Sequence, residues 1–447
     1  MRFKLSAMVG LAAGGQGCAP RVVSALPDVL IVSMDTVRGD HTTLGGYARD
    51  TTPSLAAFAQ LPGSVTFTRA YSDAAWSLPA YVSLFTGQHA VTHGVGFRSM
   101  QMVPGQPTLA AMLQAHGYQT HAYASGPHLS AAGGMDEGFD EYHHTDGART
   151  LGAQVVASVE WLTEPSEAPR LAFVHGYDAH SPFPTPALLS EMYSDHPRAE
   201  PQHCRSSTWR CLKGQKALRV GPEMTDLESH QLVAAYDAAI TFADLQLGRI
   251  LYKLDERGRL DELVVVVLSD HGEMLGEGGG QGHEYGFDDR VFQVPLVVRF
   301  PDGSAPRTVS RVVSLSDVLP TLAARLDMMV PSGTQGQVIG ELLDPPVASA
   351  PHPHRAASKC CVYVRDGDWW LSGVRDKDTM TWSLRLDGDD AVRNADEPDR
   401  LAAMQALVAG WSEGLGTPDD VTRQLGAADP ALKKALQEGG YWPAETP

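Results

Sequence analysis

The chain has 447 residues, of which 43% are hydrophobic and 20% are charged, a composition that excludes collagen-like, coiled-coil and disordered proteins. Its length exceeds what one hydrophobic core usually serves, so we expect a large domain and a smaller one. The formal net charge of -18 repels a phosphate backbone, which excludes nucleic acid as the expected partner.

The first residues have the organisation of an export signal. Arg2 and Lys4 precede a short apolar run through Ala13, and small residues then lead to Cys18. We therefore expect residues 1–23 to be a signal peptide, either of the ordinary type or of the lipoprotein type, in which Cys18 carries the lipid anchor. The expected location is bacterial and exported: periplasmic, an outer-membrane lipoprotein or secreted. No other segment offers the ~20 apolar residues that a membrane-spanning helix needs.

Short β-branched runs alternate with amphipathic helical patterns between residues 26 and 345. The runs at 28–35 and 262–270 are nearly continuous in apolar residues, which is typical of parallel strands covered on both faces. Further strands are expected at THAYA, RLAFVHG and VPLVVRF. Helices are expected at PSLAAFAQL, TLAAMLQAHGY, QVVASVEWL and in the long run that begins DLESHQ. This pattern predicts an open α/β sheet, with a site beyond the carboxyl ends of its strands.

The region after residue 345 has a different composition. Residues 346–356 are rich in Pro, Ala and Ser and are expected to form a linker. Residues 357–447 have the pattern of a hairpin-like pair of strands followed by an amphipathic helix. We therefore expect a small C-terminal α+β subdomain packed on the main sheet.

Four cysteines follow Cys18 in the chain. In an oxidising compartment, Cys204 and Cys211 are close enough in sequence to form a disulfide that closes a short loop. Free thiols are the alternative.

Carboxylate and imidazole side chains gather where predicted strands end. Asp35 ends one strand, Asp270 and His271 are adjacent at the end of another, and a glycine-rich loop then returns His283. These oxygen and nitrogen groups suit a divalent cation. The stretch FVHGYDAHSPF adds His180, whose imidazole can position an anionic substrate or act as a general acid. The alternative for such a histidine is a structural bond to loop backbone.

Ser77 lies in the stretch SDAAWSLPAYVSLFTG. One interpretation is a helix N-cap, with Pro79 in the first turn where a missing N–H does no harm. A second interpretation is a nucleophile, because a helix N-terminus favours an anionic oxygen. The two roles are compatible. A conventional serine esterase is disfavoured, because Ser77 lacks the G-x-S-x-G elbow.

Taken together, DVLIVSMDTVRGDH, WSLPAYVSLFTGQHAVTHGV, FVHGYDAHSPF and VVVVLSDHGE resemble the sulfatase family of the alkaline phosphatase superfamily. The motifs occur in family order over residues 26–345, and the segment after residue 357 looks like the family's small C-terminal subdomain. The resemblance implies an alkaline phosphatase-like α/β fold, with a mixed, mostly parallel sheet sandwiched by helices. It also implies a metal-dependent hydrolase of sulfate or related esters that acts on an anionic small-molecule or glycan ester.

The resemblance further implies one divalent metal, with Ca²⁺ the usual ion and Mn²⁺ the ion of some phosphonate-cleaving relatives. Two carboxylates and one imidazole also suit Mg²⁺ or Zn²⁺. Ser77 matches the family nucleophile, which also touches the metal. The other matched positions are metal ligands or contacts of the sulfate and the leaving oxygen: Asp35, Asp270 and His271 for the metal, and His128, His180 and His283 for the substrate.

The chain departs from the family pattern at three places. Tyr81 replaces the arginine of the Ser-x-Pro-x-Arg element that maturation enzymes recognise when they convert the nucleophile to formylglycine. Thr36 follows Asp35 where many sulfatases carry a second aspartate, and a lysine expected beside His128 is absent. The first departure argues against formylglycine at Ser77.

These departures leave three hypotheses about function. The first is a sulfatase with its nucleophile at Ser77. The second is a phosphoester or phosphonate hydrolase that uses unmodified Ser77, because a serine nucleophile leaves a stable ester with sulfate but a hydrolysable one with phosphate. The third is a sulfatase-like binding protein with little turnover. The motif order favours the first.

Overall fold

The structure is a computed structural model of the chain. The signal peptide, Cys18 and Cys204 lie outside the residues that it describes, so the predicted export signal, lipid anchor and disulfide stay predictions. The described residues are 26–145, 150–183, 185–193, 209–212, 216–219, 225–277, 280–284, 286, 288–359, 361–376, 379–387, 391–409, 430 and 434.

A large mixed sheet forms the centre of the molecule, as the resemblance implied. Its strands are parallel to their neighbours except for β11, which runs antiparallel to both β2 and β8. A further short strand, β13 (Val313–Ser314), pairs with β2. The order across the sheet is β12 (Arg307–Val309), β2 (Ser64–Tyr71), β11 (Gln293–Arg299), β8 (Leu263–Leu268), β1 (Asp28–Met34), β5 (Arg170–Gly176), β3 (Gln119–Ser125) and β4 (Glu141–Thr145).

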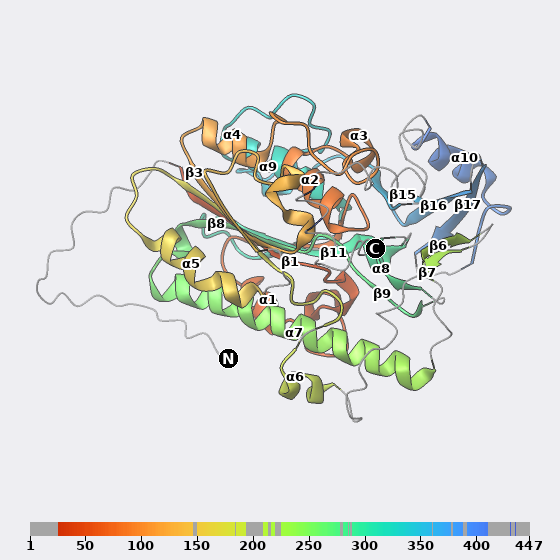
Figure 1. Ribbon diagram of the computed structural model, residues 1–447. Helices are drawn as coiled ribbons and strands as arrows, with labels where there is room; N and C mark the ends of the chain where they lie inside the picture. Colours follow the sequence, from red (N-terminus) through yellow and green to blue (C-terminus); the bar gives the residue numbers. More distant parts are fainter. Residues whose placement is uncertain are drawn as a thin grey trace, which may run out of the picture.

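Helices cover both faces of this sheet, which explains why the central strand β8 is apolar at every position (Figure 1). In β1, Val29 and Ile31 enter one hydrophobic cluster, and Leu30 and Val32 enter the other. The first cluster lies under α2 (Ser77–Thr86), α4 (Leu109–Ala115) and α9 (Val318–Arg325). The second lies under α1 (Pro53–Phe58), α5 (Leu151–Thr163) and α7 (Asp226–Glu256).

The remaining elements are short and lie in the connections. None of the helices within the described part of the chain is long and apolar enough to cross a membrane. The short elements are α3 (Ala90–His93), α6 (Ala187–Met192), β6 (Trp209–Leu212), β7 (Lys216–Arg219), β9 (Met274–Leu275), β10 (Gln281–Gly282) and α8 (Asp289–Phe292).

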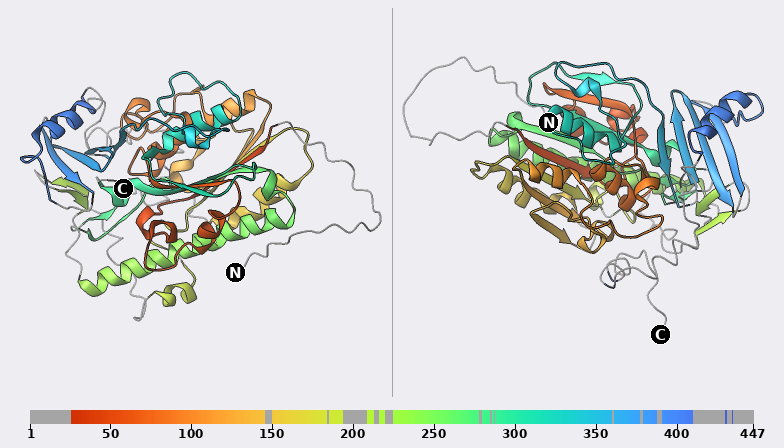
Figure 2. Two further views of the ribbon diagram at one scale, coloured as in Figure 1. Left: turned by 180° about the vertical axis from the view of Figure 1, so that it is seen from behind. Right: turned by 90° about the horizontal axis from the view of Figure 1, so that it is seen from above.

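A second, four-stranded antiparallel sheet stands at one end of the molecule (Figure 2). It consists of β14 (His354–Ala357), β15 (Cys361–Asp366), β16 (Trp369–Asp376) and β17 (Thr379–Leu386), and α10 (Pro398–Ala406) packs on it. The sequence predicted two strands and a helix here, and the structure adds β14 and one more strand.

The two sheets are joined by main-chain hydrogen bonds at β14. The amide of Ala357 donates to the carbonyl of Asp73 over 3.1 Å, and the amide of Ala75 donates to the carbonyl of Ala357 over 3.1 Å. Residues 73–75 lead directly into α2, which begins at Ser77. The C-terminal sheet therefore supports the segment that presents Ser77.

Asp244 of α7 provides a test of how the helices on one face are held together. Its buried carboxylate accepts hydrogen bonds from the amides of Ser54 and Leu55 in the first turn of α1, over 2.7 and 2.9 Å. Asp244→Ala would leave these amides without their acceptor, so we expect it to lower the free energy of unfolding by about 1–3 kcal/mol. Urea denaturation measures this, with the exposed Asp255 of the same helix changed to Ala as the control. Equal losses in the two variants would contradict the capping role.

Candidate active site

Asp35, Asp270 and His271 meet at the carboxyl ends of two adjacent central strands. β1 and β8 are paired in parallel through Ser33 and Leu268, so the residues that follow each strand emerge side by side. One ligand atom from each of the three side chains lies within 4.8 Å of the other two, and all three residues are fully buried. The structure thus brings together the three residues that the sequence assigned to a metal.

The electrostatics of this trio fit a divalent cation. Burial, and after it the nearby carboxylate of Asp35, raise the pKa of Asp270 to about 6. Burial also opposes the charge of Asp35, but a 3.1 Å contact with the Nε2 of His175 lowers the pKa of Asp35 below its usual range. Oδ2 of Asp270 is buried and accepts no hydrogen bond from any described residue. Two buried carboxylates of like charge, with Oδ2 of Asp270 only 3.2 Å from Nε2 of His271, fit a cation held between these three side chains.

Ser77 lies beside this trio at the start of α2. Its Oγ is 3.2 Å from Nε2 of His271 and 3.4 Å from Oδ2 of Asp35. The predicted N-cap position is wrong by one residue: Trp76 has the extended backbone of the N-cap, and Ser77 is the first helical residue. The hydroxyl is therefore held by the acidic and imidazole groups opposite it and not by a capping bond to its own helix.

The three histidines assigned to substrate contacts also reach the site. The ring of His283 lies 4.3 Å from that of His271 and 5.3 Å from that of His180, measured between centroids. His128 packs edge-on against Trp76, the neighbour of Ser77, with centroids 5.2 Å apart. All the site residues that the sequence singled out are therefore assembled around one point.

Burial keeps these imidazoles neutral. It lowers the pKa of His180 to about 4 and that of His283 to about 3, and it lowers the pKa of His128 below its usual range. Nδ1 of His180 lies 2.7 Å from the carbonyl of Ser181, which can only accept, so Nδ1 carries the proton and Nε2 has a lone pair. Nδ1 of His283 lies 3.3 Å from a carboxylate oxygen of Glu273, which favours the same tautomer.

Lys359 is a site residue that the sequence did not reveal. Its Nζ lies 2.5 Å from Oε1 of Glu284 and 4.7 Å from the ring centroid of Trp76. It comes from the turn between β14 and β15, and its positive charge contributes to the low pKa values of His128 and His283. No local pattern around SKCC marks this lysine, because only the pairing of β14 with residues 73–75 brings it to the site.

Tyr81 occupies the place of the family's arginine, and it is fully buried. Its hydroxyl forms a 2.8 Å hydrogen bond with Oγ of Ser33, and its ring packs edge-on against His175 with centroids 5.3 Å apart. Tyr81 therefore packs against the same imidazole, that of His175, which contacts Asp35. Tyr81 thus replaces an ionic contact with packing and a neutral hydrogen bond.

Thr36 occupies the place of the family's second aspartate. Its Oγ1 donates a short hydrogen bond to Oδ1 of Asp35, and its amide donates to Oδ1 of Asp270 over 3.1 Å. Its backbone has a positive φ of 62°, which a β-branched residue rarely adopts. The strained backbone directs the amide and the hydroxyl of one residue toward the two aspartates.

Comparison with known proteins identifies the class. The Sulfatase family model matches residues 27–328, more than half of the chain, so the chain belongs to the sulfatase family. It is 24% identical over 345 residues to the ulvan-active sulfatase of Formosa agariphila, covering 72% of this chain and 65% of that protein. It is 24% identical over 396 residues to the arylsulfatase of Clostridium perfringens, covering 71% and 78%.

Solved structures share the fold. The phosphonate monoester hydrolase of Agrobacterium radiobacter superposes with a TM-score of 0.70 at 22% identity, covering 87% of this chain and 96% of that one. A 2-O sulfatase of glycosaminoglycans superposes with a TM-score of 0.70 at 17% identity, covering 91% and 96%. The common architecture spans both sulfate- and phosphonate-cleaving proteins.

Asp270→Asn tests whether the acidic trio holds a cation. The amide removes a buried charge that repels Asp35, so we expect the variant to be at least as stable as the wild type in the presence of a chelator. At a divalent cation concentration of 100 times Kd, the wild type should gain about 2.7 kcal/mol of stability and the variant should not. Thermal unfolding with and without cation measures both effects, and Asp136→Asn, at an exposed position, is the control. Equal cation stabilisation of all three proteins would contradict the assignment.

Proposed function

We propose that this protein is a metal-dependent hydrolase of sulfate esters whose nucleophile is at Ser77. The observation that carries the proposal is the position of the Ser77 hydroxyl, within 3.4 Å of both Asp35 and His271 at the start of a buried helix. Membership of the sulfatase family supports the reaction class.

The fold prepares Ser77 for attack in two ways. First, the early amides of α2 give its N-terminus a partial positive charge, which favours an oxyanion at that point. Second, a carboxylate of Asp35 and the ring of His271 lie opposite the hydroxyl and orient it, and the carboxylate accepts its hydrogen bond. The residue is buried, so competing water is largely excluded.

Asp35, Asp270 and His271 would hold the cation, for which we propose Ca²⁺. When bound, a divalent cation lowers the pKa of an adjacent hydroxyl and polarises ester oxygens. His175 keeps the carboxylate of Asp35 in orientation through its 3.1 Å contact. Thr36 fixes the oxygens of both aspartates by the bonds described above.

His180 and His283 are placed to handle the proton of the leaving group. In the free protein both rings are neutral, with a lone pair on Nε2 as the hydrogen-bond pattern indicates. An anionic ester beside them stabilises the protonated ring, because a nearby opposite charge raises the pKa of a histidine. A ring protonated in this way donates its proton to the leaving oxygen as the ester bond breaks.

Lys359 supplies the positive charge that a sulfate group requires. The lysine expected beside His128 is absent, and the ammonium of Lys359 lies next to Trp76, the residue that precedes Ser77. Glu284 holds this ammonium in place over 2.5 Å. Lys359 therefore replaces the missing lysine from a different part of the fold.

The substrate class that we propose is a sulfated glycan or a small anionic ester. Relatives carry names that include an ulvan-active sulfatase and an N-acetylglucosamine-6-O-sulfatase. Residues 1–23 have the organisation of an export signal, with Cys18 as a lipid attachment point. We propose that the protein is exported on this basis.

A second candidate function is hydrolysis of phosphate or phosphonate esters by unmodified Ser77. The buried Tyr81 in place of the arginine used in maturation favours this candidate. An alkoxide of serine can attack phosphorus and give an ester that water hydrolyses, whereas a serine sulfate ester is stable. The substrate preference and the chemical state of Ser77 together separate the two functions.

Ser77→Ala removes the attacking oxygen. We expect kcat for an aryl sulfate to fall by about 10³-fold or more, with cation binding retained. Steady-state assays of aryl sulfates, phosphate monoesters and phosphate diesters measure this. Ser83→Ala is the matched control, because its hydroxyl lies on the same helix but bonds His93 over 3.0 Å.

Mass spectrometry of the peptide that contains Ser77 accompanies these assays. Formylglycine is lighter than serine by two hydrogens, so the two forms are resolved. Faster turnover of sulfate esters than of phosphate esters supports the proposed function. Unmodified Ser77 with a preference for phosphate esters supports the second candidate, and cation binding without turnover of any ester supports a binding protein.

Lys359→Met tests the anion contact. We expect KM for a sulfate ester to rise by about 10–100-fold, the equivalent of a charge-assisted hydrogen bond. Because the variant leaves Glu284 buried without its cation, the double variant Lys359→Met/Glu284→Gln shows whether the loss persists when that charge is removed. Lys253→Met on α7 is the control. An unchanged KM in the double variant would exclude Lys359 from substrate binding.

A further inference from the structure

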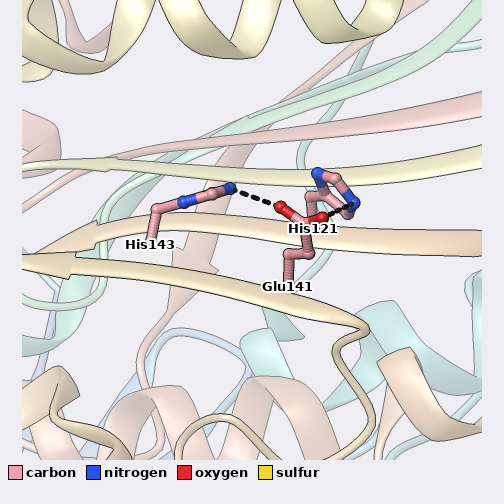
Figure 3. A group of neighbouring side chains, drawn as sticks. All are labelled: His121, Glu141 and His143. Carbon is pink, nitrogen blue, oxygen red and sulfur yellow. Dashed lines mark ion pairs between the residues drawn. The ribbon is translucent and has the colours of Figure 1, made fainter.

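A second cluster of metal-ligating side chains lies on the edge of the main sheet, on strands β3 and β4. His121 is in β3, and Glu141 and His143 are in β4. The strands pair in parallel with His121 opposite Glu141, and His143 is two residues further along, so all three side chains project from one face. Figure 3 shows the carboxylate of Glu141 between the two imidazoles, with one oxygen turned toward each.

The ligand atoms are close enough for one ion. Nε2 of His143 lies 3.1 Å from one oxygen of Glu141, and Nε2 of His121 lies 4.0 Å from the other. One atom from each residue falls within 4.8 Å of the other two. Tetrahedral bonds of about 2.0–2.2 Å place ligand atoms roughly 3.4 Å apart, a closure of ~1 Å. The half-exposed side chains of Glu141 and His143 can make that adjustment.

Aromatic neighbours hold both imidazoles in place. His121 stacks on Trp161 with ring centroids 3.8 Å apart and an angle of 13° between the planes. His143 stacks on Tyr123 with centroids 4.9 Å apart and an angle of 19°. The rings therefore give up little conformational entropy when they bind an ion, which is the advantage of a prepared site.

The protonation and the surroundings of the cluster also suit a cation. Burial lowers the pKa of His121, which keeps its ring in the neutral form that ligates metals. Its buried Nδ1 has no hydrogen-bond partner among the described residues. The cluster opens into a cavity of about 700 Å³, where Asp140 and Glu164 add negative charge and Arg170 contributes the positive charge.

We propose that His121, Glu141 and His143 form a zinc site, separate from the catalytic one. Two imidazoles and one carboxylate are a ligand set of zinc sites that keep a coordination position open, and the open position here faces the cavity. Cu²⁺, Ni²⁺ and Co²⁺ would compete for the same ligands, whereas Ca²⁺ prefers oxygen ligands and would not. The trio of Asp35, Asp270 and His271 offers two carboxylates and only one imidazole, and this oxygen-rich set favours Ca²⁺.

The site is tested by zinc titration of the full chain in competition with a chromophoric chelator. The parent protein carries Asp270→Asn, so that zinc bound at the catalytic trio does not contribute. We expect one tightly bound equivalent of zinc, which is lost on addition of His143→Gln or Glu141→Gln. His116→Gln is the matched control, because its imidazole bonds Met112 of its own helix over 2.8 Å.

Cobalt supplies an independent measurement of the ligand set. Co²⁺ bound to two imidazoles and a carboxylate in four- or five-coordinate geometry gives visible absorption bands that six-coordinate oxygen sites give only weakly. We expect these bands in the parent and in the His116 control, and their loss in the His143 variant. Since Glu141 and His143 are half-exposed, neither substitution should alter the melting temperature without zinc.

The opposite result would overturn the proposal. If the parent binds no zinc, or if the His143 and Glu141 variants bind as much as the parent, the cluster is only an ion-paired surface group. The single variant His143→Gln, made without Asp270→Asn, should hydrolyse sulfate esters as fast as the wild type. Failure of the zinc site would therefore leave the proposed function intact, and failure of the proposed function would leave the zinc site intact.

Discussion

The structure depends on the placement of two buried carboxylates, Asp35 and Asp270, at the carboxyl ends of neighbouring parallel strands. Parallel pairing of β1 with β8 forces the residues after each strand to the same edge, so two like charges meet in a fully buried position. Nearly every other feature of the site compensates for this repulsion. Thr36 donates to both carboxylates, His175 contacts one of them, and the remaining deficit of positive charge is what a divalent cation would satisfy.

Much of this arrangement was predictable from local patterns. The apolar runs that end at Asp35 and Asp270 predicted buried parallel strands, and the alternation with amphipathic helices predicted layers on both faces. The proximity of Asp35, Asp270 and His271 was predicted from the same strands, because strand ends meet at one edge of a sheet. The histidines at 128, 180 and 283 were placed by resemblance to a family whose motifs keep their order.

Other features could not be predicted, because they depend on pairing between distant segments. Lys359 reaches the site only because Ala357 bonds to residues 73 and 75, and hydrophobic periodicity contains no information about that register. The N-cap was assigned to Ser77 from residue preference, but the extended backbone at Trp76 takes that position. Strand β4 lies at the sheet edge with alternating half-buried residues, and its apolar pattern is too weak to be recognised in the sequence. Glu141 and His143, which lie on this strand, were therefore not predicted as site residues.

The bonds between β14 and the segment before Ser77 also connect activity to the completeness of the chain. Ser77 lies in the first fifth of the sequence, whereas the lysine beside Trp76 and the strand that supports this segment come after residue 353. A chain interrupted before β14 could still build most of the main sheet, yet it would lack both the positive charge near Trp76 and two main-chain bonds to the segment that presents Ser77. The support of the segment before Ser77 therefore depends on a part of the chain that is synthesised last.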